Sequence, residues 1–258
     1  MNDKSKRTIG VSAFIIGTIL LVFIGILSIW SEIEASFFDA ALRSKEPLTT
    51  LRCPAVITPN GQSFVRGSFT NPDDEPIDLQ IRTYITNGYV TLMTEFIRNI
   101  SLNPGETKTV EIPVYVEDAA YGRLVLVRMH QMKRVPLPYL NGSCGIVVFD
   151  LPWISGTQFI TLSLSLGAIF TTGGLVYWAI NAKPIVWDRK RQFVAMMIFA
   201  IISFVLTIAS LLNWWLLGVL LTVIWILMGV GMIWQFATTP RKDREREIQL
   251  DKEHRNIS

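Results

Sequence analysis

The sequence predicts a membrane protein with four transmembrane α-helices and an all-β antiparallel sandwich inserted between the first and second helix. Three observations predict this class. The chain of 258 residues is 50% hydrophobic and 17% charged, with a mean hydropathy of +0.37, which is too apolar for an ordinary soluble domain. Residues 8–31, 151–182 and 192–240 contain no Asp, Glu, Lys or Arg. Residues 53–150, in contrast, alternate short β-rich runs with turn residues.

The uncharged segments determine the number of spans, because a helix needs about 20 apolar residues to cross the hydrocarbon. The first two segments supply one span each. As a single helix the third would be about 73 Å long, more than twice the roughly 30 Å hydrocarbon thickness, so we expect it to fold back at Asn213-Trp214-Trp215. The predicted spans are Thr8–Ser31, Ile154–Ile180, Phe193–Asn213 and Leu216–Thr238.

The basic residues predict the orientation. Of the 24 Lys and Arg residues, 13 lie in three short segments on one side of the four-span path: before span one, between spans two and three, and after Pro240. We therefore expect a multi-pass protein of the cell membrane with both termini in the cytoplasm, a charged cytoplasmic tail over 240–258, and residues 32–153 outside. Span one is longer than a signal-peptide core and no cleavage site follows it, which favours an uncleaved anchor over a cleaved signal.

The net charge of +3 does not indicate nucleic-acid binding. Residues 32–153 hold 11 basic and 14 acidic side chains, so the excess of positive charge belongs to the segments expected in the cytoplasm. We therefore predict the lipid bilayer and a protein partner as contacts, and no nucleic acid.

Residues 32–52 are predicted to link the membrane to the strands through an amphipathic helix. Apolar residues recur there at helical spacing, which favours a short helix from Ser31 to Lys45 that ends before Pro47. These residues are Ile33, Phe37, Phe38, Ala41 and Leu42.

Seven strands are predicted in residues 53–150. They are Ala55–Thr58, Ser63–Thr70, Ile77–Thr86, Val90–Arg98, Thr107–Val116, Arg123–Met132 and Cys144–Phe149. Turn formers such as Asn71-Pro72-Asp73-Asp74 and Asn103-Pro104-Gly105-Glu106 separate them. Seven short strands at this spacing indicate an antiparallel sandwich.

Three motifs in this region resemble a known class of module. Ser68-Phe69-Thr70-Asn71-Pro72, then Leu102-Asn103-Pro104-Gly105-Glu106-Thr107, then Val110-Glu111-Ile112-Pro113-Val114 are similar to the immunoglobulin-like and fibronectin-III-like adhesion modules of bacterial surface proteins. The resemblance covers about 100 of the 258 residues. The region differs from antibody-type domains, because it has no Trp in the third strand and no Cys pair on the second and sixth strands. The resemblance implies an immunoglobulin-like fold and a tendency to bind or scaffold, and it carries over no functional residues.

The two cysteines, Cys53 and Cys144, both lie in the segment expected outside. An oxidising compartment favours a disulfide between them over two separate buried thiols. Such a bridge would close a loop of about 90 residues and remove up to about 4 to 5 kcal/mol of unfolded-state freedom. If the first and last strands run parallel, the starts of both strands meet at the end of the module that faces away from the membrane.

The sequence offers few reactive groups and predicts no enzyme, cofactor or metal. His130 and His254 are expected on opposite sides of the membrane, and no common hydrolase, phosphate-loop or metalloprotease motif occurs. Asp73-Asp74-Glu75 is interpreted as a solvated turn. Met129-His130-Gln131-Met132 has a composition that suits copper, but Met129 as core filler and His130 as an exposed strand residue explain it more simply.

Three features are candidate contact sites. The connection Lys133, Arg134, Leu137, Tyr139 and Leu140 is proline-rich, basic and apolar, and is expected either to contact a partner or to lie on the membrane or the sandwich edge. Ser163, Gly167 and Thr171 form a stripe of small residues on span two, which favours packing within this bundle over packing against another protein. The charged tail is expected to be a solvated helix with Arg241 and Lys242 near anionic lipid.

These observations lead to three hypotheses. The first is a non-enzymatic membrane protein whose outer sandwich binds or scaffolds an envelope partner, as an accessory subunit of a membrane complex. The second is a carrier or permeation subunit for a lipid or apolar substrate. The third, an outer-face enzyme or metal carrier, would need His130 at the base of a polar pocket.

Overall fold

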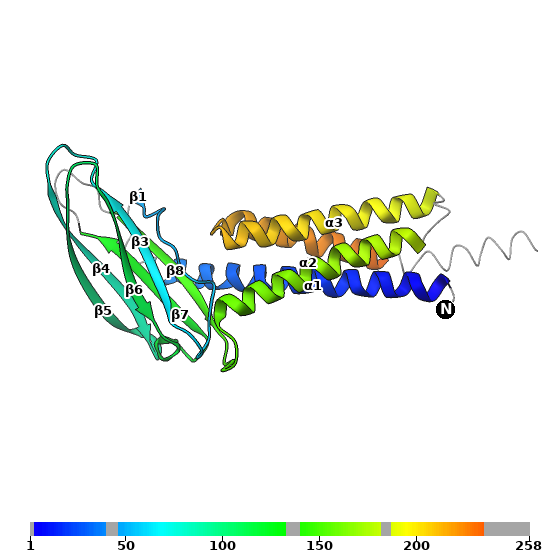
Figure 1. Cartoon of the computed structure of the whole chain (residues 1–258), viewed down its shortest axis with the longest axis horizontal. Coiled ribbons are helices and arrows are strands. Elements are labelled where there is room, and N and C mark those ends of the chain that lie inside the picture. Colours follow the sequence, from blue (N-terminus) through cyan, green and yellow to red (C-terminus); the bar gives the residue numbers. More distant parts are fainter. Residues whose placement is uncertain (1–2, 40–45, 133–139, 182–186, 235–258) are drawn as a thin grey trace, which may run out of the picture.

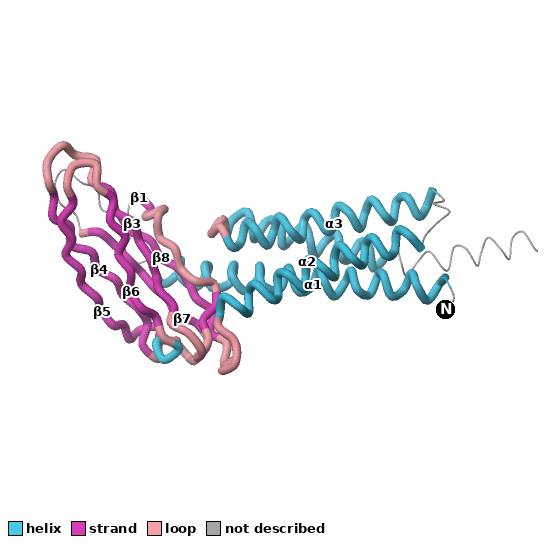
Figure 2. The backbone as a smooth tube through the Cα atoms, viewed as in Figure 1, coloured by secondary structure: helices cyan, strands magenta, loops and turns pink. Residues whose placement is uncertain are grey.

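The computed structural model describes residues 3–39, 46–132, 140–181 and 187–234. These residues form a bundle of four long helices with a β module, residues 46–148, at one end of it (Figure 1). Figure 2 shows the same division, with the helices and the strands at opposite ends of the molecule. The charged tail 240–258 lies outside the described residues.

Four helices are long and apolar enough to cross a membrane. They are α1 (Asp3–Asp39), α2 (Gly156–Asn181), α3 (Trp187–Leu211) and the helix Trp215–Trp234. The first two uncharged segments supply one helix each and the third supplies two, as predicted.

The predicted helix is present over residues 31–39, but it is not a separate element that follows span one. α1 continues without a break from Asp3 to Asp39. Residues 31–39 contain no Gly or Pro that would stop the helix. Ala35 lies fully buried against the β module, so tertiary packing stabilises the extra turns. Residues 40–45 of the predicted linker helix lie outside the described part of the chain.

The reversal between the last two helices occurs where the sequence predicts it. Asn213 adopts a left-handed conformation with φ of 62°, and its N–H donates to the carbonyl of Ser210 (3.2 Å). The N–H of Trp214 donates to the carbonyl of Ala209 (2.9 Å). Asn tolerates this conformation better than most residues, and the two hydrogen bonds satisfy carbonyls at the end of α3.

The β module contains one mixed sheet of six strands and one sheet of two. The strands are β1 (Glu46–Pro47), β2 (Val56–Ile57), β3 (Ser63–Thr70), β4 (Ile77–Asn87), β5 (Tyr89–Leu102), β6 (Thr107–Val114), β7 (Leu124–Gln131) and β8 (Leu140–Val148). The large sheet has the order β1-β8-β7-β4-β5, with β2 also on β8, and β3 pairs with β6 in the small sheet. A 3-10 turn, Val116–Asp118, follows β6.

The prediction of a purely antiparallel sandwich is wrong, because β1 and β2 both pair parallel to β8. This pairing confirms that the first and last predicted strands run parallel. β8 begins at Leu140, four residues earlier than predicted, and β5 extends to Leu102. β1 was not predicted, since two residues that include a Pro carry no strand pattern.

The two sheets share one hydrophobic core. It draws buried residues from both sheets: Val65, Phe69, Ile81, Ile112, Val127 and Ile146 are among them. Along β3 and β4 the buried side chains alternate with more exposed ones, as the period of two requires, whereas every residue of β7 is buried. Neither sheet closes into a barrel in the described part of the chain.

α1 contacts both halves of the molecule through glycines that allow close approach. A Cβ on Gly17 of α1 would collide with the backbone of Thr171 on α2. In the β module, a Cβ on Gly145 of β8 would collide with the carbonyl of Ser31. The helix therefore packs directly on the backbone of the sheet.

Replacing Gly145 with Ala should separate α1 from β8 and lower the free energy of unfolding by about 2 kcal/mol, the usual cost of overpacking. Thermal unfolding of the purified protein in mild detergent measures this. Gly173→Ala is the control, since a Cβ there meets nothing within 4 Å and Ala favours the helix by up to about 1 kcal/mol. Equal stability of the two variants would contradict the close approach.

Candidate interaction site

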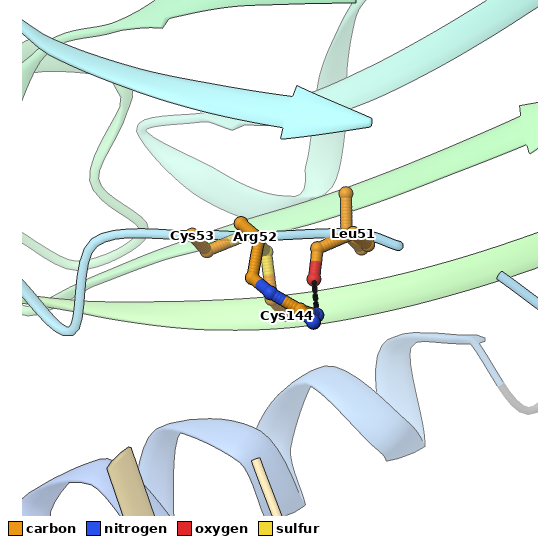
Figure 3. The surroundings of a disulfide bond; sticks show 4 residues. All are labelled: Leu51, Arg52, Cys53 and Cys144. Atoms are coloured by element: carbon orange, nitrogen blue, oxygen red, sulfur yellow. Dashed lines mark hydrogen bonds between the residues drawn. A yellow bond between two sulfur atoms is a disulfide. The ribbon is translucent and has the colours of Figure 1, made fainter. Parts of the chain in front are cut away.

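The predicted disulfide between Cys53 and Cys144 is present and spans 91 residues of sequence. It joins the segment before β2 to the middle of β8 (Figure 3). Next to it, Nη1 of Arg52 donates to the carbonyl of Leu51 (2.9 Å), as Figure 3 shows, and to that of Thr49 (2.9 Å). The bridge holds the chain entering the module against the strand that leads out of it.

A polar cleft of about 410 Å³ lies where the module meets the bundle. Residues from α1, β8 and the turn before the last helix line it, including Glu32, Ser36, Asn141 and Trp214. The carboxylate of Glu32 accepts a hydrogen bond from the backbone N–H of Gly145. This bond adds a polar contact to the approach of α1 and β8.

Aromatic and cationic side chains cover the face of the large sheet that meets α1. The guanidinium of Arg128 on β7 lies over the rings of Phe38 (5.7 Å) and Tyr84 (4.8 Å). The ring of His130 stacks on Tyr84 at a centroid distance of 5.5 Å, and the hydroxyl of Tyr84 donates to Oε1 of Glu95 (2.8 Å). These contacts connect α1 to β4, β5 and β7.

The interpretation of His130 as an exposed strand residue is wrong, because its side chain is only 4% exposed. Met129 points into the core, as predicted, while Met132 is partly exposed. The described residues contain no group of three His, Cys, Asp or Glu side chains that could hold a metal. His130 thus lies in an aromatic and cationic environment.

The electrostatics of this cluster lower the pKa of His130 below its ordinary value of about 6.5. Burial is the main cause, and the positive charges of Arg128 and Arg82 act in the same direction, with Glu95 opposing them. His130 therefore favours the neutral form in the folded protein.

Exposed apolar side chains of the module lie along β5, on both faces of the strand. Tyr89, Leu92, Met93 and Ile97, here named the β5 row, are each between 43% and 56% exposed. Tyr121, from the loop after the 3-10 turn, extends this surface with an edge-on contact to the ring of Tyr89 (5.7 Å). Clusters of exposed apolar side chains on a module with a closed core are candidate sites of protein contact.

A second apolar surface lies in the helix bundle. A groove of about 330 Å³ runs between α1, α3 and the last helix, and is lined almost entirely by apolar atoms. Phe14, Thr18, Phe199, Trp225 and Gly229 are among its walls. One of the few polar contacts beside it is the bond from Nε1 of Trp225 to the hydroxyl of Ser203 (2.9 Å).

The predicted partner connection lies mostly outside the described residues: Lys133, Arg134, Leu137 and Tyr139 belong to 133–139. Leu140 starts β8, pairs with Glu46 and packs against the core. On α2, Gly167 and Thr171 are buried and Ser163 is half-buried. A Cβ on Gly167 would lie 2.8 Å from Leu21, so this part of the stripe faces α1.

Sequence reasoning missed the β5 row. Residues 89–97 carry apolar side chains at both even and odd positions. Such a pattern is typical of a strand buried on both faces. Only the strand order reveals that β5 lies at the edge of the sheet, with both faces partly exposed.

Comparison with known proteins adds little. No family model and no curated protein matches this chain. Among solved structures, the β-glucuronidase of Bacteroides uniformis is 20% identical over 38% of this chain, with a TM-score of 0.28, and this chain covers 12% of it. An alkylpurine DNA glycosylase of Pseudomonas fluorescens is 15% identical over 37% of this chain, with a TM-score of 0.27, and this chain covers 28% of it. Neither likeness carries a functional argument.

The lowered pKa of His130 predicts that acid destabilises the protein. As the pH falls through about 6.5, His130 binds a proton in the unfolded chain before it does so in the folded protein. The neutral, buried His130 therefore contributes fully to stability above this pH, and the contribution is lost as the pH falls below it. Between about pH 7.5 and 5, the free energy of unfolding should decrease more steeply in the wild type than in His130→Gln. The two slopes should differ by at most about 1.4 kcal/mol per pH unit, and thermal unfolding at a series of pH values measures them. Parallel pH curves would contradict this.

Proposed function

We propose that this chain is a non-enzymatic, multi-pass membrane protein whose outer immunoglobulin-like module binds or scaffolds a protein partner in the cell envelope. In this proposal the four helices cross the cell membrane, both termini lie in the cytoplasm, and residues 32–153 lie outside. The three basic segments support the orientation. The disulfide supports an oxidising compartment for the module.

The side chains that could perform chemistry support a binding role. Cys53 and Cys144 are joined to each other, so neither is available as a nucleophile. The ring of His130 is buried against Tyr84 and Arg128 rather than lining an open pocket. Its environment stabilises the contact between α1 and the sheet.

The observation that carries the proposal is the β5 row. Several exposed apolar side chains along one strand are not needed for the core of the module or for its contact with the bundle, and such clusters are typical of interaction surfaces. The junction with α1 lies mainly on β7 and β8, and at the start of β5 only Val90 packs against it. The rest of β5 is separated from β7 by β4. Met93 and Ile97 of the β5 row therefore lie away from the junction, whereas Tyr89 lies beside it.

Photo-crosslinking tests this proposal. A photoreactive residue in place of Leu92, in the full chain in its native membrane, should yield one reproducible heavier adduct. The matched control carries the same residue in place of Arg66, which is also exposed but lies on β3 of the small sheet. Equal adducts at both positions, or none at Leu92, would argue against partner binding through β5.

The apolar groove between α1, α3 and the last helix favours a second candidate function, a carrier or permeation subunit for a lipid or apolar substrate. Its walls could hold an acyl chain. This chain would belong to a substrate if the protein is a carrier, and to a structural lipid if the protein binds a partner. The two readings differ in whether the occupant is exchanged between membranes.

Filling the groove tests for an occupant. A Cβ on Gly229 would lie 3.8 Å from Phe199, so the larger side chain of Gly229→Leu would occupy the groove. Native mass spectrometry should find one phospholipid retained by the wild type and lost from this variant. Gly231→Leu on the same helix is the control, since nothing lies within 4 Å of a Cβ there. Retention by all three proteins would exclude a specific site.

A further inference from the structure

We infer that the open edge of β5 accepts an extended strand of a partner protein, which adds a seventh strand to the large sheet. This inference rests on the proposed partner-binding function and names its mode. β5 has 14 residues and ends the strand order β1-β8-β7-β4-β5. No strand in the described part of the chain pairs with its other side. Strand addition to such an edge is a common mode of peptide recognition.

The register identifies which backbone groups of β5 are open. The carbonyl of Gln80 on β4 accepts a hydrogen bond from the N–H of Met132 (3.0 Å). The backbone N–H and C=O groups of the even-numbered residues of β4 are therefore directed toward β7. The backbone groups of the odd-numbered residues of β4 then form the hydrogen bonds to β5. Their partners are even-numbered, as in the pairs Ile81 with Arg98 and Thr83 with Phe96.

The odd-numbered residues of β5 therefore direct their N–H and C=O groups away from the sheet. A side-chain contact supports this assignment: Nζ of Lys108 donates to the carbonyl of Ser101 (2.5 Å). The backbone groups left for a new strand belong to Met93, Glu95, Ile97 and Asn99. Four residues with both a donor and an acceptor make a continuous ladder.

From Met93 to Asn99 this edge has one of the usual protections against pairing, the charge of Arg98, which lies on the same face as Phe96 and Ile100 of the core. Natural edge strands are often short, or carry a Pro, a bulge or an inward-pointing charge. β5 is long, contains no Pro, and keeps its register with β4 from Met93 to Leu102. At the hairpin end β5 bulges at residues 90–92, because Thr86 pairs with Met93 and Asn87 with Tyr89.

The charges along β5 indicate the chemistry of the partner. Glu95 is already held by Nη1 of Arg82 (3.3 Å) and by Tyr84. Arg98 is exposed and takes part in none of the ion pairs in the described residues. On the open side Arg98 occupies a non-hydrogen-bonded position, where opposed side chains lie closest. The matching strand thus carries a carboxylate opposite Arg98, with apolar or β-branched residues beside Met93 and Ile97.

A second copy in the same membrane does not fit this edge. A symmetric antiparallel pair has its twofold axis along the sheet normal, whereas two copies in one bilayer are related by an axis along the membrane normal. α1 packs along the face of β7 and β8 through Leu27, Ala35 and Phe38, so the sheet normal there points across the helix and not along it. Twist of about 20–25° per strand over two strands leaves the normal at β5 at least about 40° from the helix axis.

Amide hydrogen exchange tests the inference on the full chain in phosphatidylcholine–phosphatidylglycerol nanodiscs. The probe is a synthetic antiparallel peptide of about ten residues, alternating Thr and Val, with one Glu placed opposite Arg98. It should slow the exchange of Met93, Glu95, Ile97 and Asn99 at least about tenfold, while Thr94, Phe96 and Arg98 are protected by β4 with or without peptide. Exchange on β5 that is unchanged by the peptide would overturn the inference.

Backbone N-methylation of the peptide separates strand addition from side-chain adhesion. Methyl groups on the two residues that flank the Glu remove donors that face β5, and should abolish binding. Methyl groups on the Glu and its second neighbours face away and should leave binding within about threefold. Equal affinity of the two methylated peptides would also overturn the inference.

Substitutions in β5 complete the test. Ile97→Pro removes an open donor without touching the bonds to β4, and should weaken the peptide about tenfold, whereas Ile97→Thr keeps the donor and should bind like the wild type. Arg98→Glu should weaken the Glu peptide about threefold and favour a Lys version of it. The photo-crosslinked adduct at Leu92 in the native membrane could also persist unchanged in Ile97→Pro. That result would reject strand addition but would still support a partner that binds at β5.

Discussion

The architecture depends on one helix that belongs to two hydrophobic cores. The first part of α1 packs against α2 and α3, and its last turns pack on β7 and β8. Both contacts are backbone-close, because Gly17 and Gly145 leave no side chain between the elements. α1 contains no Pro that would introduce a sharp kink. The position of the β module relative to the bundle is therefore set by the helix itself rather than by a flexible linker.

This arrangement divides the faces of the large sheet by role. One face builds the core with β3 and β6. The other is occupied by α1 at β7 and β8, with the cluster of Arg128, Tyr84 and His130 filling the space beside the helix. β5 is left at the far edge, where neither the small sheet nor α1 completes its hydrogen bonding. The accessible surface of the module is a result of where α1 packs.

Much of the fold could be predicted from the sequence, because the relevant physics is local. The absence of charge over 192–240 forces a reversal, and Asn213 supplies a residue that can adopt it. Two cysteines expected in an oxidising compartment predict their own pairing. The strands follow from alternation and turn residues, with errors of a few residues at their ends.

The features that failed depend on contacts distant in sequence. The sequence predicts helix on both sides of Ser31, but only the packing of Ala35 on the sheet explains why the two parts form one continuous helix. The parallel pairing of β1 with β8 has no sequence pattern, and His130 is buried by Tyr84, which lies 46 positions away. The β5 row is of the same kind. A strand can be recognised from its residues, but its neighbours cannot, and an edge is defined by a missing neighbour.

The disulfide has a mechanical consequence. A load applied to β5 passes through β4 and β7 to β8, and from β8 it can reach the bundle by two routes: along the chain into α2, and across the packed interface into α1. The segment of residues 46–57 would be the first to peel from β8 under tension, because β1 and β2 have only two residues each. The covalent bond from Cys53 to Cys144 fastens that segment between its two short strands. Traction on the module is thus shared by two anchoring helices.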